Sequence, residues 1–198
     1  MRVARSVRPL LTLCLLLCAW ALSPGAGAVH AASLDVEEDA LHEIQGPWAF
    51  HWQTFLSPSE ARFPPADAEI RLPSSWTQIE LGGETLPPTG HASYRLTLDL
   101  GTNRPDSLML RIPLVYSAYR FYMNGDLVAQ VGRPATSPAE ARPDYGERQV
   151  WIDHPDQHLE LLLHVSNFSS RVAGVPRAIQ VGTPETVNRL LATELILS

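Results

Sequence analysis

The chain contains 198 residues, with 15 basic residues, 21 acidic residues and a net charge of −6. Its length suits one domain with a substantial hydrophobic core, and its acidic balance argues against binding to nucleic acid or to an anionic membrane surface. Both cysteines, Cys14 and Cys18, fall within the first 28 residues, so the rest of the chain can form neither a disulfide nor a cysteine metal site.

The first 28 residues have the pattern of a secretory signal peptide. Three arginines precede an apolar run from Leu10 to Leu22, and Ala26-Gly27-Ala28 supplies the small residues of a cleavage site before Val29. An uncleaved membrane anchor is the alternative, although the apolar run is short for a bilayer span. The pattern predicts a periplasmic or other extracytoplasmic location. From Val29 onward the chain carries 12 basic and 21 acidic residues, a net charge of −9.

The first clear strand is aromatic, and an irregular region follows it. Large aromatic residues alternate with smaller ones so that Trp48, Phe50 and Trp52 share one face of a strand. Residues 55–90 are rich in proline and glycine, so we expect little regular structure there. A region of this kind wraps a sheet or borders a site.

From Ser93 the sequence follows a two-residue period. Polar residues alternate with an apolar set, which consists of Tyr94, Leu96, Leu98 and Leu100. Residues 108–112 repeat the pattern after a turn. The alternation predicts two antiparallel strands, each with one buried face and one solvated face.

An antiparallel hairpin is predicted for residues 116–131. Asn124-Gly125 separates two alternating runs, and a two-residue type I′ turn requires positive φ at both central positions, which these residues adopt most readily. Alternation also sorts the hairpin's aromatic residues into two pairs, Tyr119 with Phe121 and Tyr116 with Tyr122. One pair is predicted to lie in the core and the other to be partly exposed.

Three further apolar segments complete the predicted strands: residues 150–152, 159–165 and 179–181. About eight strands at short spacing, with turn residues between them, are typical of an all-β sandwich. We therefore predict a jelly-roll β-sandwich over residues 29–182.

Residues 183–198 are predicted to leave the sandwich as a helix. Thr183 suits the N-cap, Pro184 the first helical position and Glu185 the positive end of the helix dipole. The apolar residues that share one face of this helix are Val187, Leu190, Leu191 and Leu195. Two interpretations follow: the helix is a linker towards a membrane region missing from this sequence, or it folds back on the domain.

Several short blocks, taken in order, carry a resemblance to a known family. The blocks are Gly46-Pro-Trp48, Leu72-Pro-Ser-Ser-Trp76, Ala92-Ser-Tyr94-Arg95-Leu96, Ile112-Pro-Leu-Val-Tyr116 with the Asn124-Gly125 hairpin, and Val165-Ser-Asn167-Phe168. From about Gly46 to Asn188 the chain resembles the N-terminal periplasmic domain of bacterial seven-transmembrane receptors with diverse intracellular signalling modules. More distantly it is similar to the galactose-binding-like jelly roll at the start of family 2 glycoside hydrolases.

The resemblance implies a galactose-binding-domain-like sensor module on a membrane signalling receptor. In such receptors seven membrane helices and a cytoplasmic output domain follow the sensor, and none of these is present in this sequence. The implied partners are a small-molecule ligand, with a carbohydrate as the candidate class, and the membrane-embedded part of the receptor.

Catalytic chemistry is not signalled by any spacing. The sequence contains neither a Gly-x-Ser-x-Gly nucleophile elbow nor a His-Glu-x-x-His zinc motif. The carboxylates Asp144, Glu147 and Glu160 are interpreted as solvated surface charges. In family 2 hydrolases the catalytic carboxylates belong to a separate barrel domain, so we expect no enzyme activity, no cofactor and no metal.

Sugar recognition requires an aromatic platform beside amide, carboxylate or guanidinium groups, because one sugar face is apolar and its hydroxyls need partners. The candidate ligand-binding residues are Trp76, His91, Tyr116, Tyr119, Asn167 and Arg171. Most of them also have a structural interpretation. Trp76 is suited to plug one end of the sandwich, the tyrosines to cross-strand packing and Asn167 to satisfying buried backbone.

The main hypothesis is a non-enzymatic extracytoplasmic sensing domain that binds a carbohydrate or other small molecule. The alternative is a structural or protein-interaction module that packs on a receptor core or a dimer partner. A remnant of a sugar-processing enzyme is the third and weakest hypothesis. A sensor is expected to show a concave patch of aromatic and polar groups, and an interaction module a flatter apolar patch.

Overall fold

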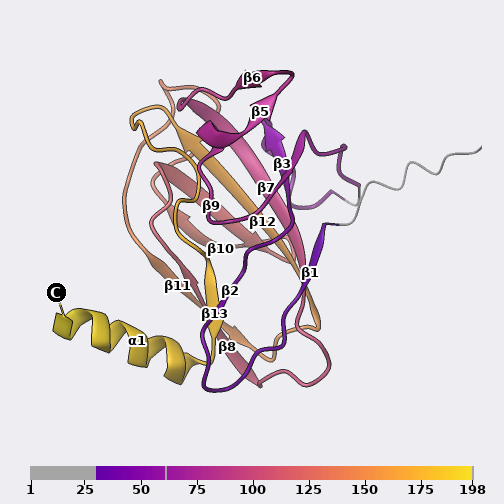
Figure 1. Cartoon of the computed structure of the whole chain (residues 1–198), viewed down its shortest axis with the longest axis vertical. Helices are drawn as coiled ribbons and strands as arrows, with labels where there is room; N and C mark the ends of the chain where they lie inside the picture. The colour runs from indigo at the N-terminus through magenta and orange to yellow at the C-terminus, as the bar shows by residue number, and fades with distance from the viewer. Residues whose placement is uncertain (1–29, 61, 198) are drawn as a thin grey trace, which may run out of the picture.

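The computed structural model describes residues 30–60 and 62–197 and shows two β-sheets packed face to face (Figure 1). The seven-stranded sheet has the order β10 (Asp126–Val131), β9 (Ala118–Met123), β12 (His158–Asn167), β7 (Gly90–Asp99), β3 (Trp48–Trp52) and β4 (Ala68–Ile70), with β1 (Ala31–Ser33) parallel to β7. The four-stranded sheet has the order β11 (Arg148–Asp153), β8 (Ser107–Ile112), β13 (Gln180–Gly182) and β2 (His42–Glu43). The predicted all-β sandwich is confirmed. The predicted signal peptide, residues 1–28, lies outside the described residues.

The core fills the space between the two sheets. Its largest fully buried side chains from the seven-stranded sheet are Trp48, Phe50, Tyr94, Tyr119 and Phe121. Leu108, Leu110 and Ile112 face them from β8. Each such side chain stabilises the fold by roughly 1.5–3 kcal/mol when it leaves water. The alternation found in the sequence therefore corresponds to real sheet faces, and Tyr119 and Phe121 are the core pair of the hairpin.

The predicted hairpin is confirmed. β9 and β10 pair antiparallel, with Met123 opposite Asp126, and the two turn residues Asn124 and Gly125 have φ of +51° and +89°. A side chain at Gly125 would have its Cβ 3.3 Å from the backbone oxygen of Pro58, so glycine also permits a close approach by another segment.

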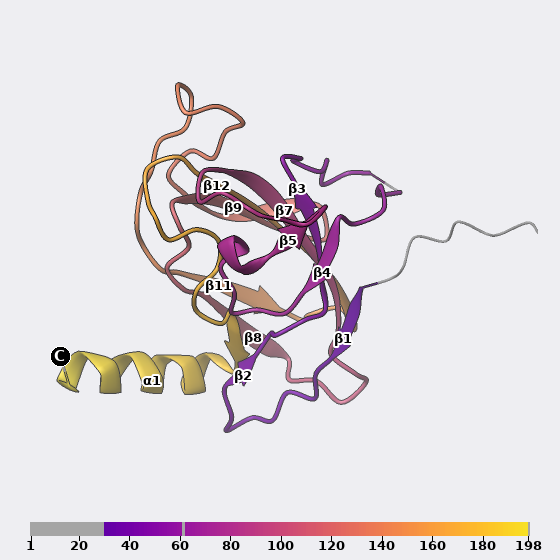
Figure 2. The same cartoon turned by 45° about the horizontal axis from the view of Figure 1, so that its top comes forward.

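That segment is the strap, which we define as residues 53–60 and 62–67 between β3 and β4. It crosses the outer face of the seven-stranded sheet, and Figure 2 shows its outer part as a purple loop beside β3 and β4. Because of the strap, His51 on β3 and Ser93 on β7 are buried, although both point away from the core. The prediction of one solvated face is therefore wrong for the first half of β7, where a distant segment covers it.

Several short strands were not predicted. They are β1, β2, β4 and a small hairpin of β5 (Glu80–Leu81) and β6 (Glu84–Thr85), which follows a 3-10 helix, η1 (Trp76–Gln78). Each contains only two or three residues, too few to show a period. These strands form because the neighbouring strands of the folded sheets provide hydrogen-bonding partners for them.

The chain ends in helix α1 (Pro184–Leu197), which begins where the sequence predicts it. Thr183 Oγ1 accepts a hydrogen bond from the Thr186 backbone N–H at 3.4 Å, and Val187 is fully buried. Further along, Glu194 pairs with Arg111 of β8 at 2.8 Å, while the end of the helix points away from the sandwich (Figure 1). No helix in the described part of the chain is long and apolar enough to cross a bilayer.

Candidate functional site

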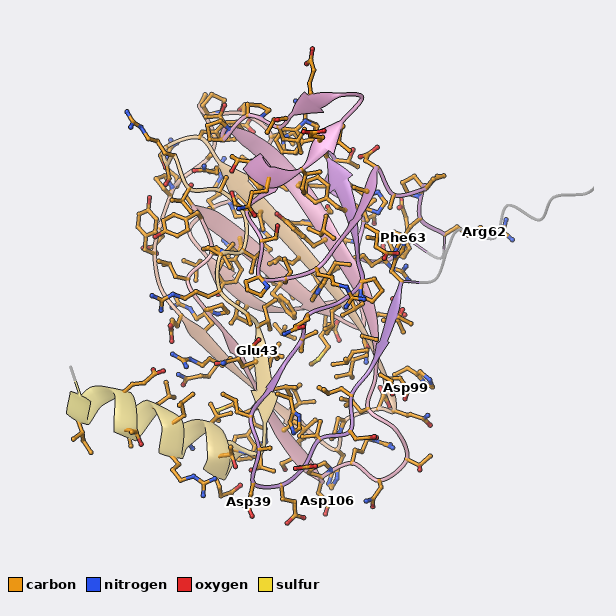
Figure 3. The ribbon with its side chains drawn as sticks, viewed as in Figure 1. Asp39, Glu43, Arg62, Phe63, Asp99 and Asp106 are labelled. Atoms are coloured by element: carbon orange, nitrogen blue, oxygen red, sulfur yellow. The ribbon has the colours of Figure 1, made fainter. Side chains whose placement is uncertain are left out.

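A hollow of about 430 Å³ lies between the strap and the outer face of the seven-stranded sheet. We call it the strap pocket. Its lining comes from the strap, from β7 and β12, and from the Asn124-Gly125 turn, and consists of Pro58, Glu60, Phe63, Arg95, Asn124, Gly125, Glu160, Leu161 and Leu162. Phe63, labelled in Figure 3, lies on the strap at the flank of the sandwich. The pocket therefore depends on segments that are far apart in the sequence.

A charged pair lies in the pocket. Arg95 Nη2 donates to Glu160 Oε2 at 2.7 Å, and Thr97 Oγ1 donates to Glu160 Oε1 at 2.6 Å. Glu160 is opposite Thr97 in the β12–β7 ladder, which places Arg95 on the diagonal. The ring of Phe63 lies 4.3 Å from the Arg95 guanidinium carbon, a cation–π distance. Glu160 is thus a surface carboxylate, as the sequence indicates, with 45% of its side chain exposed, but it is paired with Arg95 rather than free.

An amide completes the polar side of the pocket. Asn124 Oδ1 accepts from the Glu160 backbone N–H at 2.8 Å, and the Asn124 backbone N–H donates to the Glu160 carbonyl at 2.9 Å. The hairpin turn is therefore fixed to β12 by two hydrogen bonds. On the exposed side, Asn124 Nδ2 donates a hydrogen bond to Asp156 Oδ2 at 3.1 Å. The pocket presents an amide and a charged pair beside the apolar surfaces of Phe63, Pro58 and Leu162.

The strap is held down by polar groups of the sheet rather than by an apolar face. Ser93 Oγ accepts from the Leu56 N–H at 3.0 Å and donates to the Thr54 carbonyl at 2.8 Å. His164 Nε2 lies 2.8 Å from the Leu56 carbonyl, so this nitrogen carries the proton. Phe55 stacks on His164, with ring centroids 4.7 Å apart. These contacts fix the position of the strap's first half, next to the pocket.

Burial keeps the histidines under the strap neutral. It lowers the pKa of His164 to about 4, against an opposing hydrogen bond to the Leu56 carbonyl. Burial also lowers the pKa of His51 and of His91. Because a charged imidazole is costly to bury, the packing of the strap over these side chains favours neutral histidine.

Three of the predicted ligand-binding residues, Trp76, Tyr119 and Asn167, are fully buried. Trp76 is fully buried, and its indole N–H donates to the Pro87 carbonyl at 2.9 Å, so it plugs the sandwich. Tyr119 is also fully buried, and burial raises the pKa of its hydroxyl. Neither side chain reaches the surface, so neither can serve as a ligand platform.

Asn167 serves the backbone around it. Its Nδ2 donates to the carbonyls of Pro88, Ser170 and Val172 at 2.8–3.1 Å. Its Oδ1 accepts from the backbone N–H groups of Ser169 and Ser170. The side chain is fully buried and thereby ties the loop after β12 to the loop before β7.

Asn167→Ala is expected to lower the free energy of unfolding by about 3 kcal/mol, because it leaves several partly buried backbone groups without their partner. Urea denaturation of the two proteins measures this difference. Ser169→Ala, a substitution at an exposed residue nearby, serves as the control, and its free energy of unfolding is expected to change by less than about 1 kcal/mol. An equally small change for Asn167→Ala would mean that water replaces its hydrogen bonds.

The other predicted residues lie apart from the strap pocket. His91 is buried under the strap, where its ring meets Phe55 at 5.0 Å. Tyr116 is half-buried and packs edge-on against Tyr145 at 5.8 Å, and Arg171 is exposed on the loop after β12. None of the six lines the strap pocket. The structure therefore places the predicted set in the core, under the strap and on the loop end.

The residues that do line the pocket gave weak signals in the sequence. Arg95 and Glu160 occupy outward positions of alternating strands, where a charge is expected in any case. Phe63 stands among prolines in an irregular segment. The Asn124-Gly125 sequence predicts a turn but carries no sign that the same residues form one wall of the pocket.

No family model and no curated protein matches the sequence. Among solved structures, the chain is similar to a Faecalibacterium prausnitzii β-glucuronidase, with a TM-score of 0.57 and 16% identity over 74% of this chain and 32% of that one. It is also similar to an uncultured Clostridium sp. β-glucuronidase, with a TM-score of 0.58 and 16% identity over 78% of this chain and 30% of that one.

A Bacteroides uniformis β-glucuronidase gives a TM-score of 0.53 and 16% identity, over 72% of this chain and 17% of the other. The chain thus spans a third or less of each of these proteins. At this identity the similarity establishes the fold alone: the chain has the β-sandwich fold of domains found in glycoside hydrolases.

Proposed function

We propose that the chain is the extracytoplasmic ligand-sensing domain of a bacterial membrane signalling receptor, and that it binds a saccharide in the strap pocket. The observation that carries the proposal is the convergence of Phe63, the Arg95–Glu160 pair and Asn124 on one hollow. An aromatic ring offers a surface to the apolar face of a sugar, while the charged pair and the amide offer donors and acceptors to its hydroxyls. The receptor role rests on the family resemblance and the predicted export signal.

The fold neighbours add modest support. They are β-glucuronidases, proteins of carbohydrate chemistry, and the matched part is a minor share of each. We propose that this chain, like a non-catalytic domain, binds without cleaving. Hydrolysis of a glycosidic bond requires two carboxyl groups flanking that bond; Glu60 and Glu160 both line the strap pocket, but Glu160 is already held by Arg95 and Thr97.

Thermal melting of the protein against a panel of mono- and oligosaccharides, including glucuronides, tests the proposal. A ligand at a hundredfold excess over its Kd stabilises the folded state by about 2.7 kcal/mol, which raises the melting temperature by roughly 5–10 °C for a domain of this size. We expect a saturable rise with at least one saccharide.

Glu160→Gln and Arg95→Gln are expected to weaken that binding by roughly 10- to 100-fold, because each removes a charge-assisted hydrogen-bonding group from the pocket. Glu84→Gln, an exposed carboxylate on β6, is the matched control and should bind normally. If the pocket variants bind as tightly as the unaltered protein, the saccharide site lies elsewhere. If no saccharide raises the melting temperature, the proposal that the domain binds a saccharide is wrong.

A further inference from the structure

A second surface lies on the outer face of the four-stranded sheet, away from the strap. On its edge strand β11, Val150 and Ile152 point into the core, whereas Trp151 points outward with 57% of its surface exposed. The other described tryptophans are buried or half-buried. An indole of this exposure on an otherwise polar strand face is a typical interaction residue, since tryptophan is enriched where partners bind.

Trp151 borders a hollow of about 480 Å³ at the foot of the domain. The hollow lies between the turn before β8, the start of α1 and the segment before β2. Its other lining residues are Glu38, Asp39, Pro105, Asp106, Ser107, Thr183, Pro184 and Glu185. Figure 3 shows Asp39 and Asp106 near each other at this end of the molecule. We call the hollow and the indole together the Trp151 surface.

The charge of this surface has one sign. Glu38, Asp39, Asp106 and Glu185 bring four carboxylates, and no arginine is among the described residues that line the hollow. Arg189, on the next turn of α1, forms an exposed ion pair with Asp39: its Nη2 lies 3.9 Å from Asp39 Oδ1 and donates to the Asp39 carbonyl at 3.4 Å. Glu38, Asp106 and Glu185 have no ion-pair partner among the described residues, so the hollow beside the indole keeps a net negative charge.

We propose that the Trp151 surface binds an arginine side chain from a basic segment of a partner protein. A planar guanidinium stacks on an indole face and donates hydrogen bonds to carboxylates at the same time, which a lysine ammonium does less well. Charge complementarity selects this occupant over others. An anionic membrane surface is repelled by the four carboxylates, and a neutral saccharide makes use of the indole but not of the net charge.

The proposal is independent of the saccharide site, because the two surfaces lie on the outer faces of different sheets and share no residue. It gives the domain a protein contact besides its ligand. Loss of one surface should therefore leave binding at the other unchanged.

Tryptophan fluorescence tests the proposal directly, because Trp151 is the most exposed described indole. The probes are three acetylated, amidated peptides, Gly-Arg-Gly-Arg-Gly and its versions with lysine or with citrulline, the neutral isostere of arginine. We expect a saturable change in emission with the arginine peptide, binding at least tenfold weaker with the citrulline peptide and intermediate binding with the lysine peptide. Raising the salt concentration tenfold should weaken arginine binding several-fold.

Trp151→Leu should abolish the fluorescence response, so its binding of the arginine peptide is measured by calorimetry instead. Asp106→Asn should weaken binding of the arginine peptide at least threefold. Leu127→Ala and Asp126→Asn, exposed residues on the other sheet, are matched controls and should bind normally. Equal binding of the arginine and citrulline peptides overturns the proposal. So does a saccharide that quenches Trp151 while the arginine peptide does not, or unchanged calorimetric binding in both Trp151→Leu and Asp106→Asn.

Discussion

Replacing Trp76 with alanine is expected to lower the free energy of unfolding by about 4 kcal/mol, the range of aromatic-to-alanine changes in protein cores. The Trp76 ring is fully buried, packs edge-on against Trp52 at 5.3 Å and donates a hydrogen bond to the Pro87 carbonyl. Its loss leaves a cavity and an unpaired carbonyl. Since a domain is stabilised by only about 5–15 kcal/mol in total, the variant should be close to unfolding at 37 °C.

Urea denaturation of Trp76→Ala and Trp151→Ala compares the same substitution at a buried and an exposed tryptophan. We expect a change below about 1 kcal/mol for Trp151→Ala, because that ring is largely in water already. Trp76→Phe should lie between the two. A well-folded Trp76→Ala protein that has lost only saccharide binding would instead restore the ligand-platform interpretation of this residue.

Acidification is the second large effect. His164 has an ordinary pKa of 6.5 when the chain is unfolded, and burial lowers it to about 4 in the folded protein. Between these values the unfolded state binds more protons, so stability falls as the pH falls. The contribution of His164 is fully present above pH 6.5 and declines as the pH is lowered towards its folded pKa. At about pH 4.5 the loss amounts to roughly 2.5 kcal/mol.

His164→Gln isolates this contribution, because its amide can donate to the Leu56 carbonyl but does not titrate. We expect the variant to be less stable than the unaltered protein at pH 7.5 and to lose less stability on acidification to pH 4.5. The charged and aromatic groups facing His164 are Arg120, Tyr122 and Phe55. Parallel pH profiles for the two proteins would show that titration of another group, not of His164, lowers the stability.

The sandwich could be predicted because its central strands satisfy two requirements at once. Residues such as Leu96 and Leu98 repeat with the period of a strand, and the pattern selects the face that is buried in the structure. The Asn124-Gly125 turn is equally local, since its positive φ values follow from the two residue types. Local chemistry was enough for these elements.

The strap pocket could not be predicted from local sequence patterns. Its walls meet only when the strap folds across the sheet, and the attachment uses backbone groups of Thr54 and Leu56, which any sequence supplies. His164 and Ser93 occupy outward positions where polar residues are expected, so nothing in the pattern marks them as buried.

Residue type alone was also a poor guide to the ligand-binding residues. Asn167 and Trp76 have the chemistry of sugar recognition, but the same groups satisfy backbone and fill the end of the core. Whether an amide binds backbone carbonyls or a ligand, and whether an indole fills the core or faces a ligand, can be decided only when the positions of the neighbouring segments are known.

The central claim, that a saccharide binds in the strap pocket, is tested most directly by mapping amide NMR shifts during titration with the saccharides of the melting panel. The account predicts saturable shifts concentrated on Phe63, Arg95, Asn124 and Glu160. Shifts that gather instead on the loop end around Tyr116 and Arg171, or spectra that no saccharide changes at saturating concentration, would contradict it.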